Sequence, residues 1–261
     1  MNTQAIRNLL FSVIAICISQ PAMSEFSLDS GNRPITLGLG AMYRDKPYKN
    51  FSSSERTNPV PVVLYEGEHF FARGSTIGWD FLDSSVVELA VIGEFIGEGY
   101  ESSDSRFLKG MSDRDPTLGL GGHIIWKPEN LGLKAVAVTD IADNSDGTQL
   151  RGEVFYTHRT GDWMFKPTAS IVWQDEDFND YYYGVRTKEI NPFIGRTRYS
   201  ADSDINYRVG AFAAYQQKAS PWMFIGGVLY NFLGDEIEDS SIVDEDNELI
   251  GLIGVAYTLG K

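Results

Sequence analysis

Cysteine is almost absent from the 261 residues, because Cys17 is the only one. It lies in an N-terminal segment with Arg7, an apolar run over residues 9–18 and the small residues Ala22 and Ser24, which is the anatomy of a secretory signal peptide. We expect residues 1–24 to be removed, leaving one domain over residues 25–261. The mature chain would then contain no cysteine, which excludes disulfides, thiol catalysis and cysteine-metal sites.

Two further features are missing. No stretch of 18 apolar residues follows the N-terminal segment, which excludes a helical membrane protein. Positive charge is also scarce, with 22 Lys and Arg against 36 Asp and Glu and a net charge of −14. Because nucleic-acid binding depends on neutralising phosphates with Lys and Arg, the composition argues against a nucleic-acid partner.

Aromatic residues and glycine are, by contrast, abundant, with 13 Tyr, 15 Phe, 5 Trp and 26 Gly. Residues 163–173 read WMFKPTASIVW, with apolar residues on the parity of Trp163 and Trp173 and largely polar residues on the parity of Lys166. This period-two alternation predicts a strand with two unlike faces. Ten steps at about 3.3 Å, tilted by roughly 40°, span about 25 Å, the height of the apolar band of an outer-membrane barrel.

The same alternation recurs along the chain, and helical periodicity appears nowhere at length. It predicts an all-β fold, an antiparallel up-and-down transmembrane β-barrel of about twelve strands in the outer membrane, in contact with its lipid and lipopolysaccharide; a soluble β-sandwich is the alternative. The predicted strands cover 34–43, 59–65, 69–81, 86–94, 117–127, 132–142, 150–160, 163–173, 180–185, 205–216, 222–233 and 249–259. The predicted aromatic girdle comprises Tyr43, Trp79, Trp126, Trp163, Trp173, Tyr207, Tyr215, Trp222 and Tyr257.

Charged residues share the parity that would face the barrel interior. A Lys or Arg at mid-depth on the lipid side costs about 2 to 4 kcal/mol, whereas charges of opposite sign can pair across a wet lumen. Arg73 is an exception, since its parity matches that of the lipid-facing Trp79. The predicted lumen-lining residues are Glu88, His123, Lys134, Arg151, Glu153, Lys166 and Arg208.

The lengths of the links test the topology. With a periplasmic N-terminus, the long links 44–58, 186–204 and 234–248 fall outside the cell, as expected for a barrel. The long link 95–116 falls on the periplasmic side, so either a strand has been missed or this link faces the cell wall or plugs the lumen. Its candidate partner or plug residues are Asp104, Arg106, Phe107, Leu108, Met111 and Arg114.

Four stretches resemble the MipA/OmpV family of outer-membrane barrels. They are GLGAMYR (38–44), PVPVVLYEGEHFFARG (59–74), SSDSRFLKGMSDRDPTLGLGG (102–122) and WQDEDFNDYYYGV (173–185). The resemblance implies an outer-membrane barrel and a non-enzymatic scaffold that brings a lytic transglycosylase together with a penicillin-binding peptidoglycan synthase. One departure is the end of the chain, where Lys261 stands in place of the terminal aromatic residue of such barrels.

Candidate chemistry is sparse. Of the three histidines, His158 comes nearest to a hydrolytic motif, with Thr160 where lipid A deacylases resemble His-x-Ser-Asn. Residues 142–153 partly resemble a calcium loop, but a turn is the simpler interpretation. The acidic runs 175–180 and 235–248 are interpreted as solvated loops that could attract the divalent cations of lipopolysaccharide. We therefore expect no cofactor, metal or catalytic residue; a narrow pore for small solutes is the alternative function, and a lipid-modifying enzyme the third.

Overall fold

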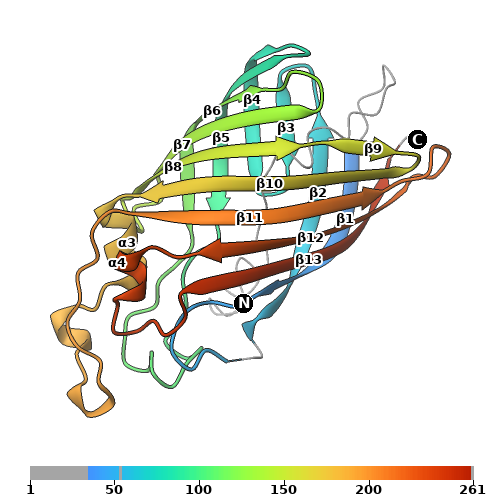
Figure 1. Cartoon of the computed structure of the whole chain (residues 1–261). Helices are drawn as coiled ribbons and strands as arrows, with labels where there is room; N and C mark the ends of the chain where they lie inside the picture. The colour runs from blue at the N-terminus through green and yellow to red at the C-terminus, as the bar shows by residue number, and fades with distance from the viewer. Residues whose placement is uncertain (1–34, 53–54, 260–261) are drawn as a thin grey trace, which may run out of the picture.

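The computed structural model describes residues 35–52 and 55–259, and shows an antiparallel sheet closed into a barrel (Figure 1). The predicted signal peptide and the terminal Lys261 lie outside the described residues. The strands are β1 (Ile35–Arg44), β2 (Thr57–Glu66), β3 (Phe70–Arg73), β4 (Thr76–Asp83), β5 (Val87–Ile96), β6 (Thr117–Trp126), β7 (Leu131–Asp140), β8 (Thr148–Tyr156), β9 (His158–Thr160), β10 (Trp163–Gln174), β11 (Asp204–Tyr215), β12 (Trp222–Phe232) and β13 (Asn247–Thr258).

Each strand pairs with its neighbours, and β1 pairs with β13 to close the wall. Because β8 and β9 both pair with β10, they form one interrupted strand, and the barrel has twelve strands as predicted. The short helices are α3 (Glu176–Tyr183), η2 (Thr187–Glu189), η3 (Pro192–Ile194) and α4 (Asp235–Glu238). No helix in the described part of the chain is long and apolar enough to cross a membrane.

The alternation seen in the sequence corresponds to the two faces of the wall. Along β10, outward side chains such as Trp163 and Ile171 are exposed, whereas inward ones such as Met164, Lys166 and Val172 are buried. The predicted girdle residues all lie on the outward parity, most of them exposed and Tyr43, Trp173 and Tyr215 half-buried. Near the end where the described chain begins and ends, ring contacts join Trp163 to Tyr215 (centroids 4.9 Å apart) and Trp222 to Tyr257 (5.0 Å).

Two strand predictions were wrong, and their errors cancel in the strand count. Residues 69–81 form two strands, because the chain reverses at Gly74, whose φ of 61° suits a tight hairpin turn. Residues 180–185 are not a strand but the end of α3 and the residues after it. This helix starts because the Asp175 side chain accepts a hydrogen bond from the Phe178 N–H at 3.0 Å and caps the helix.

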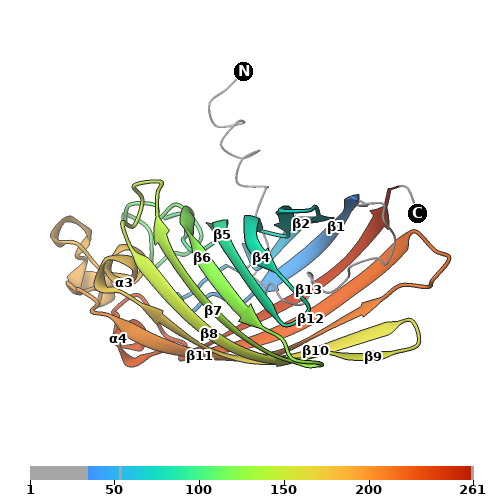
Figure 2. The same cartoon turned by 90° about the horizontal axis from the view of Figure 1, so that it is seen from above.

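The extra turn at Gly74 changes the side on which the next links lie. All the long links, 45–56, 97–116, 141–147, 175–203 and 233–246, emerge at one end of the barrel, whereas the described ends of the chain and the short turns lie at the other. Figure 2 shows α3 and α4 at the end opposite the β9–β10 and β11–β12 turns. Short turns face the periplasm in outer-membrane barrels, so link 97–116 faces outward and its predicted periplasmic position is wrong.

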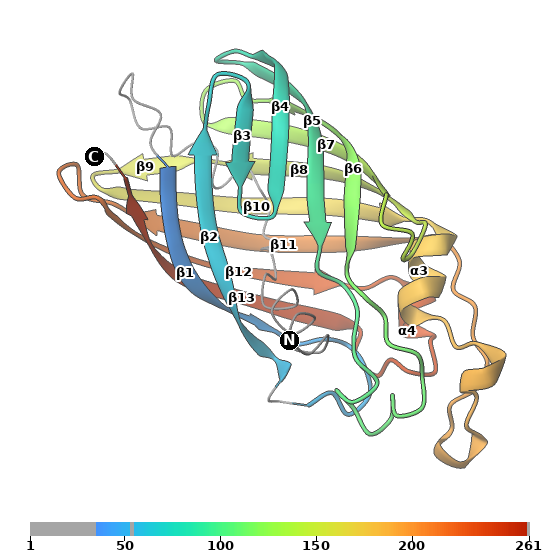
Figure 3. The ribbon, with the colours of Figure 1, turned by 180° about the vertical axis from the view of Figure 1, so that it is seen from behind.

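The hairpin of β3 and β4 leaves part of the wall incomplete (Figure 3). Of the residues in β2, only Leu64–Glu66 pair with β3. One further hydrogen bond follows, from Gly74 N–H to Val63 O at 2.9 Å. From Val63 back to the start of β2, which lies at the end with the long links, no described strand pairs with this edge of β2. Pro59 and Pro61 share the parity of Val63, so their missing N–H groups are on this open edge. Proline is confined to edge strands because it cannot donate to a neighbour, which explains the sequence PVPVV.

Inward phenylalanines cover glycines on the neighbouring strand. Phe155 lies directly opposite Gly132, and Phe212 lies opposite Gly227. A Cβ added at Gly132 would come within 2.0 Å of the Phe155 ring, so the ring occupies the space that the glycine leaves. On the other side of the ring lies Lys166, whose Nζ is 3.7 Å from the ring centroid. Glycine therefore permits the ring stacking that positions a buried lysine.

We expect Gly132→Val to lower barrel stability by about 1 to 3 kcal/mol, because the new side chain displaces the Phe155 ring in a packed interior. The measurement is the urea midpoint of the barrel in detergent, read from its heat-modifiable mobility on gels. Gly251→Val is the matched control, since its nearest neighbouring atom would lie 3.9 Å away, at an ordinary contact distance. Equal midpoints for the two variants would contradict this role for the glycine.

Candidate functional site

The seven predicted lumen residues all lie on the inward-facing parity of their strands, buried or half-buried. Arg151 on β8 makes two hydrogen bonds to Glu94 on β5, one of them NH1 to Oε1 at 2.8 Å. Lys134 lies opposite Glu153 in the β7–β8 register, and Arg208 Nε donates to Asn231 Oδ1 at 3.1 Å. Glu94 was missed although it shares the parity of Glu88 in VELAVIGEF. Paired charges rather than a single sign therefore line this part of the interior.

Arg73, which the sequence could not place, faces the interior. Because the chain turns at Gly74, Arg73 and Trp79 are on different strands and face opposite sides. The Arg73 guanidinium binds Glu66 through Nε (2.8 Å) and NH2 (3.0 Å), and its NH1 binds Glu88 Oε1 at 2.6 Å. Glu88 also contacts His123 Nε2 at 2.8 Å and Lys127 Nζ at 3.2 Å, so it is held by three neighbours at once.

A third group lies at the outer end of β1. Arg44 Nε is 2.5 Å from Glu248 Oε1, its NH2 is 2.6 Å from Glu98 Oε2, and its NH1 donates to Gly97 O at 3.0 Å. Lys46 donates to Gly99 O, and burial, followed by the positive charge of Arg44, lowers the pKa of Lys46 to about 8. These contacts join β1, β13 and the start of link 97–116.

A cavity of about 340 Å³ lies beside this group, where β2 has its open edge. Asn58 and Pro59 of β2 line one side, and residues 97–101 line another. Its charged lining residues are Lys46, Glu55, Glu98, Glu101, Asp104 and Arg114. The incomplete wall therefore borders a polar cavity near the outer end.

The long links pack together into a cap with its own hydrophobic core. Link 97–116 contributes the fully buried Leu108 as well as Met111, which accepts a hydrogen bond from the Tyr100 hydroxyl at 3.7 Å. The core is continuous with inward residues of the wall such as Ile92 and Val138, so it extends from the cap into the barrel. The other core residues that the long links contribute are Tyr48, Phe51, Phe178, Tyr182, Tyr183, Val185, Leu233, Ile237, Ile242 and Val243.

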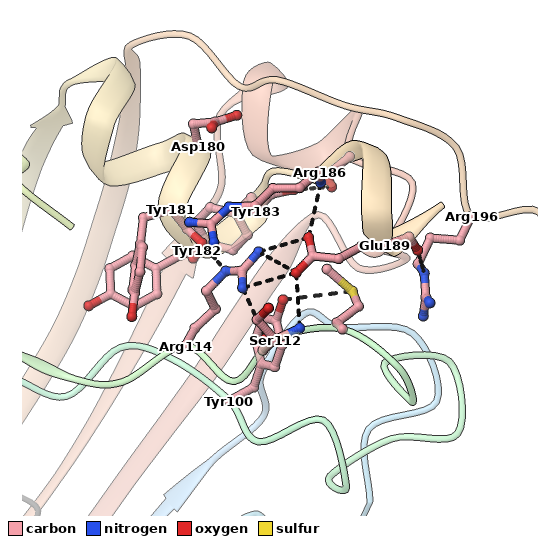
Figure 4. A network of polar contacts seen from close by, with 12 residues as sticks. Tyr100, Ser112, Arg114, Asp180, Tyr181, Tyr182, Tyr183, Arg186, Glu189 and Arg196 are labelled. Atoms are coloured by element: carbon pink, nitrogen blue, oxygen red, sulfur yellow. Dashed lines mark hydrogen bonds and ion pairs between the residues drawn. The ribbon is translucent and has the colours of Figure 1, made fainter. Parts of the chain in front are cut away.

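A buried ion pair joins two links of the cap (Figure 4). Arg114 NH2 lies 3.1 Å from Glu189 Oε2, and both side chains are almost completely buried. Glu189 also accepts from the backbone N–H of Ser112 at 2.9 Å and of Arg186 at 3.0 Å. Burial alone would raise the pKa of Glu189, but these hydrogen bonds and the Arg114 charge lower it to about 2. The carboxylate is therefore ionised and fully engaged.

Arg196 adds a second bond between the same links. Its Nε donates to the backbone oxygen of Glu189 at 2.7 Å, and its NH1 donates to the backbone oxygen of Phe107. Neither Glu189 nor Arg196 was singled out from the sequence, because their partners are 75 and 89 positions away. No local pattern in the sequence identifies such contacts.

The candidate segment 104–114 is part of this cap, and the prediction that it faces the cell wall is wrong. Leu108 and Arg114 are buried, and Phe107 packs against the cap core. Asp104 accepts from the Glu101 N–H at 2.8 Å, which stabilises a turn, and Arg106 is exposed. The plug interpretation agrees with this packing, since the segment lies over the outer mouth of the barrel.

The remaining sequence candidates have structural roles or are solvated. His158 and Thr160 are both exposed on β9, and His158 has no described hydrogen-bond partner that would orient it as a base. Residues 142–146 form a turn, as expected, because the Asp140 carboxylate accepts from the N–H groups of Asn144 and Ser145. Glu153 lies in β8 and faces the interior, so it is not part of this turn.

The comparisons with known proteins agree with this architecture. A family model described as MltA-interacting protein MipA matches residues 37–259. The chain is 29% identical to the outer membrane protein YiaT of Escherichia coli K12, with 85% of this chain and 90% of that protein covered. It is 27% identical to the MltA-interacting protein of the same organism, with 85% and 88% covered.

It is also 28% identical to the outer membrane protein OmpV of Vibrio cholerae, over 74% of this chain and 75% of that protein. Among solved structures, an outer membrane channel from Pseudomonas putida F1 matches with a TM-score of 0.44 and 9% identity, covering 89% of this chain and all of that one. The family match spans nearly the whole described barrel. The chain therefore belongs to the MipA family of outer-membrane proteins.

Proposed function

We propose that this protein is a sealed, non-enzymatic barrel that holds a lytic transglycosylase, and through it a penicillin-binding peptidoglycan synthase, at the inner face of the outer membrane. The observation that carries the sealed barrel is the cap, whose hydrophobic core continues into the wall. The MltA-interacting protein, a relative that aligns over 85% of the chain, supports the choice of partner. A sealed barrel suits anchoring better than transport.

The docking surface in this proposal is the periplasmic end. A wall enzyme acts in the periplasm, so it meets the short turns rather than the cap. These turns carry exposed charges, including Glu68, Glu129 and Lys218. The turns are residues 67–69, 84–86, 127–130, 161–162 and 216–221.

The test is a crosslinked pull-down from outer-membrane extracts with charge-reversal variants at the two ends. The periplasmic variant combines Glu68→Lys, Glu129→Lys and Lys218→Glu, and the control combines Glu101→Lys, Asp177→Lys and Glu245→Lys on exposed cap positions. We expect the intact protein and the control to recover both wall enzymes, and the periplasmic variant to lose most of each. All forms must first show heat-modifiable gel mobility, which reports a folded barrel.

Two outcomes would count against the proposal. If the control loses the enzymes as completely as the periplasmic variant does, the docking surface is not at the short turns. If the intact protein recovers neither enzyme, the anchoring role is wrong. The charged interior then favours the second candidate function, a narrow pore, for which Arg151 and Glu94 would line the path. Steady conductance of the intact barrel in a planar bilayer would support that pore. The absence of conductance would support a sealed barrel.

A further inference from the structure

A polar cluster near the periplasmic end of the barrel contains a set of metal ligands that the proposed anchoring role does not use. One ligand atom from each of Asp80 on β4, Glu88 on β5 and His123 on β6 lies within 4.8 Å of the others. All three residues are buried, with exposed fractions of 6%, 0% and 3%. Three adjacent strands therefore direct an imidazole and two carboxylates to one point.

Two atoms of this cluster lack a hydrogen-bond partner among the described residues. They are Oδ1 of Asp80 and Nδ1 of His123, both fully buried. Since a carboxylate can only accept, the contact with Glu88 Oε1 places the proton of His123 on Nε2, which leaves a lone pair on Nδ1. Both orphaned atoms are thus acceptors, and two buried acceptors without a donor favour a bound cation.

The charges of the cluster also favour a bound cation. Arg73 is bound through two nitrogens by Glu66, and Lys127 lies 3.7 Å from Asp83 and 3.2 Å from Glu88. Among the buried and half-buried groups, the three carboxylates Glu66, Asp80 and Glu88 outnumber the two cations Arg73 and Lys127, and the excess is one negative charge. Lys134, higher on the wall, lies opposite Glu153. A bound cation would offset the excess.

The backbone is also unusual at this point. The β4–β5 register shifts between Asp80 and Leu82, which is a β-bulge. Bulges change the direction of a side chain and occur next to functional sites. The Phe71 ring stacks on the His123 ring with centroids 5.8 Å apart and fixes its orientation. Asp83 is exposed and Glu66 and Lys127 are half-buried, so polar side chains next to the cluster are in contact with solvent.

We propose that one Zn²⁺ ion binds inside the barrel to Asp80 and to Nδ1 of His123, while Glu88 holds the imidazole through its Nε2–H. An imidazole and a carboxylate suit this borderline ion, whereas Mg²⁺ and Ca²⁺ prefer oxygen alone. The ligand atoms would approach one another by about an ångström to reach the usual Zn bond lengths, a movement within reach of side-chain rotation. The ion fastens β4 to β6 across β5, beside the short β3–β4 hairpin.

The experiment is a calorimetric titration of the full-length barrel with ZnCl₂ in detergent, after treatment with EDTA. We expect one Zn²⁺ per barrel and a higher unfolding temperature with the metal. Asp80→Asn keeps the shape of the side chain and His123→Gln keeps a neutral polar group of similar length, and each should weaken binding by about tenfold or more. His158→Gln is the matched control, because His158 is exposed and far from the cluster, and it should bind like the unaltered protein.

The proposal is overturned if the unaltered barrel binds no Zn²⁺, or if both cluster variants bind as tightly as the control. If a variant fails the heat-modifiability test, X-ray absorption of the unaltered, Zn-loaded barrel decides instead. Nitrogen and oxygen ligands at about 2.0 to 2.2 Å, including one imidazole, support the site, and a shell of water oxygens alone contradicts it. None of these outcomes depends on whether a wall enzyme docks.

Discussion

Replacing Glu189 by Ala should open the outer cap while leaving the barrel folded. The change leaves the Arg114 guanidinium, whose side chain is 0% exposed, without its carboxylate partner. Breaking such a buried ion pair costs about 3 to 5 kcal/mol. It also removes the acceptor of the Ser112 and Arg186 N–H groups. Hydrogen exchange of cap amides should accelerate by about a hundredfold or more, since 1.4 kcal/mol corresponds to a factor of ten.

The control for this prediction is Glu176→Ala, which removes an exposed carboxylate from the same link and should leave cap exchange unchanged. A double variant with Met at both Arg114 and Glu189 should recover part of the loss, because no charge is left buried. The cap should also open in acid. Since the folded pKa of Glu189 is about 2 and its ordinary value is 4.5, this stability is present above about pH 4.5 and is lost as the pH falls towards 2. Unchanged exchange in Glu189→Ala would show that the ion pair does not hold the cap.

Replacing Arg44 by Met should weaken the barrel where its first and last strands meet. Arg44 bridges Glu248 on β13 and Glu98 in link 97–116, and both carboxylates are largely buried. Without the guanidinium, two buried negative charges face each other, and the expected cost is about 3 to 5 kcal/mol. The measurement is the urea midpoint of the folded barrel in detergent, read from heat-modifiable mobility.

Arg56→Met is the matched control for Arg44→Met. Arg56 pairs with Asp45 at 2.9 Å, but about a third of each side chain is exposed. Exposed ion pairs contribute only about 0 to 1 kcal/mol, so this control should move the midpoint much less. A similar shift in the two variants would mean that burial of the Arg44 cluster does not determine its contribution.

The sequence predicted the wall well because strand alternation is a local property. The parity of Trp163 and Lys166 in one strand is enough to separate the lipid side from the interior. The same reasoning failed at Arg73, because it treated 69–81 as one strand. A signal was present: Gly74 and Ser75 form a Gly-Ser pair between two strand-like runs, which is a hairpin signature. A missed turn reverses the direction of the strands that follow it, here up to the wrongly predicted strand 180–185, so one local error moved link 97–116 to the wrong end.

The candidate sites were predicted less completely. The seven lumen residues could be named from parity, but their partners could not, because Arg151 and Glu94 are 57 positions apart. The same holds for the metal ligands, since the strand register and a β-bulge bring Asp80 beside Glu88 and His123. Contacts of this kind depend on register, and register has no signature in one strand taken alone.

By itself, the sequence determined the class of the protein and the two faces of its wall. The lack of cysteine and of long apolar runs excluded other classes, and the period-two alternation with terminal aromatic residues specified a barrel. Only the tertiary structure decided which end carries link 97–116, that Arg114 meets Glu189 in a packed cap, and which carboxylates remain unbalanced inside. The reason is physical: side-chain direction follows from neighbours along the chain, whereas charge pairing and cap packing follow from closure of the sheet.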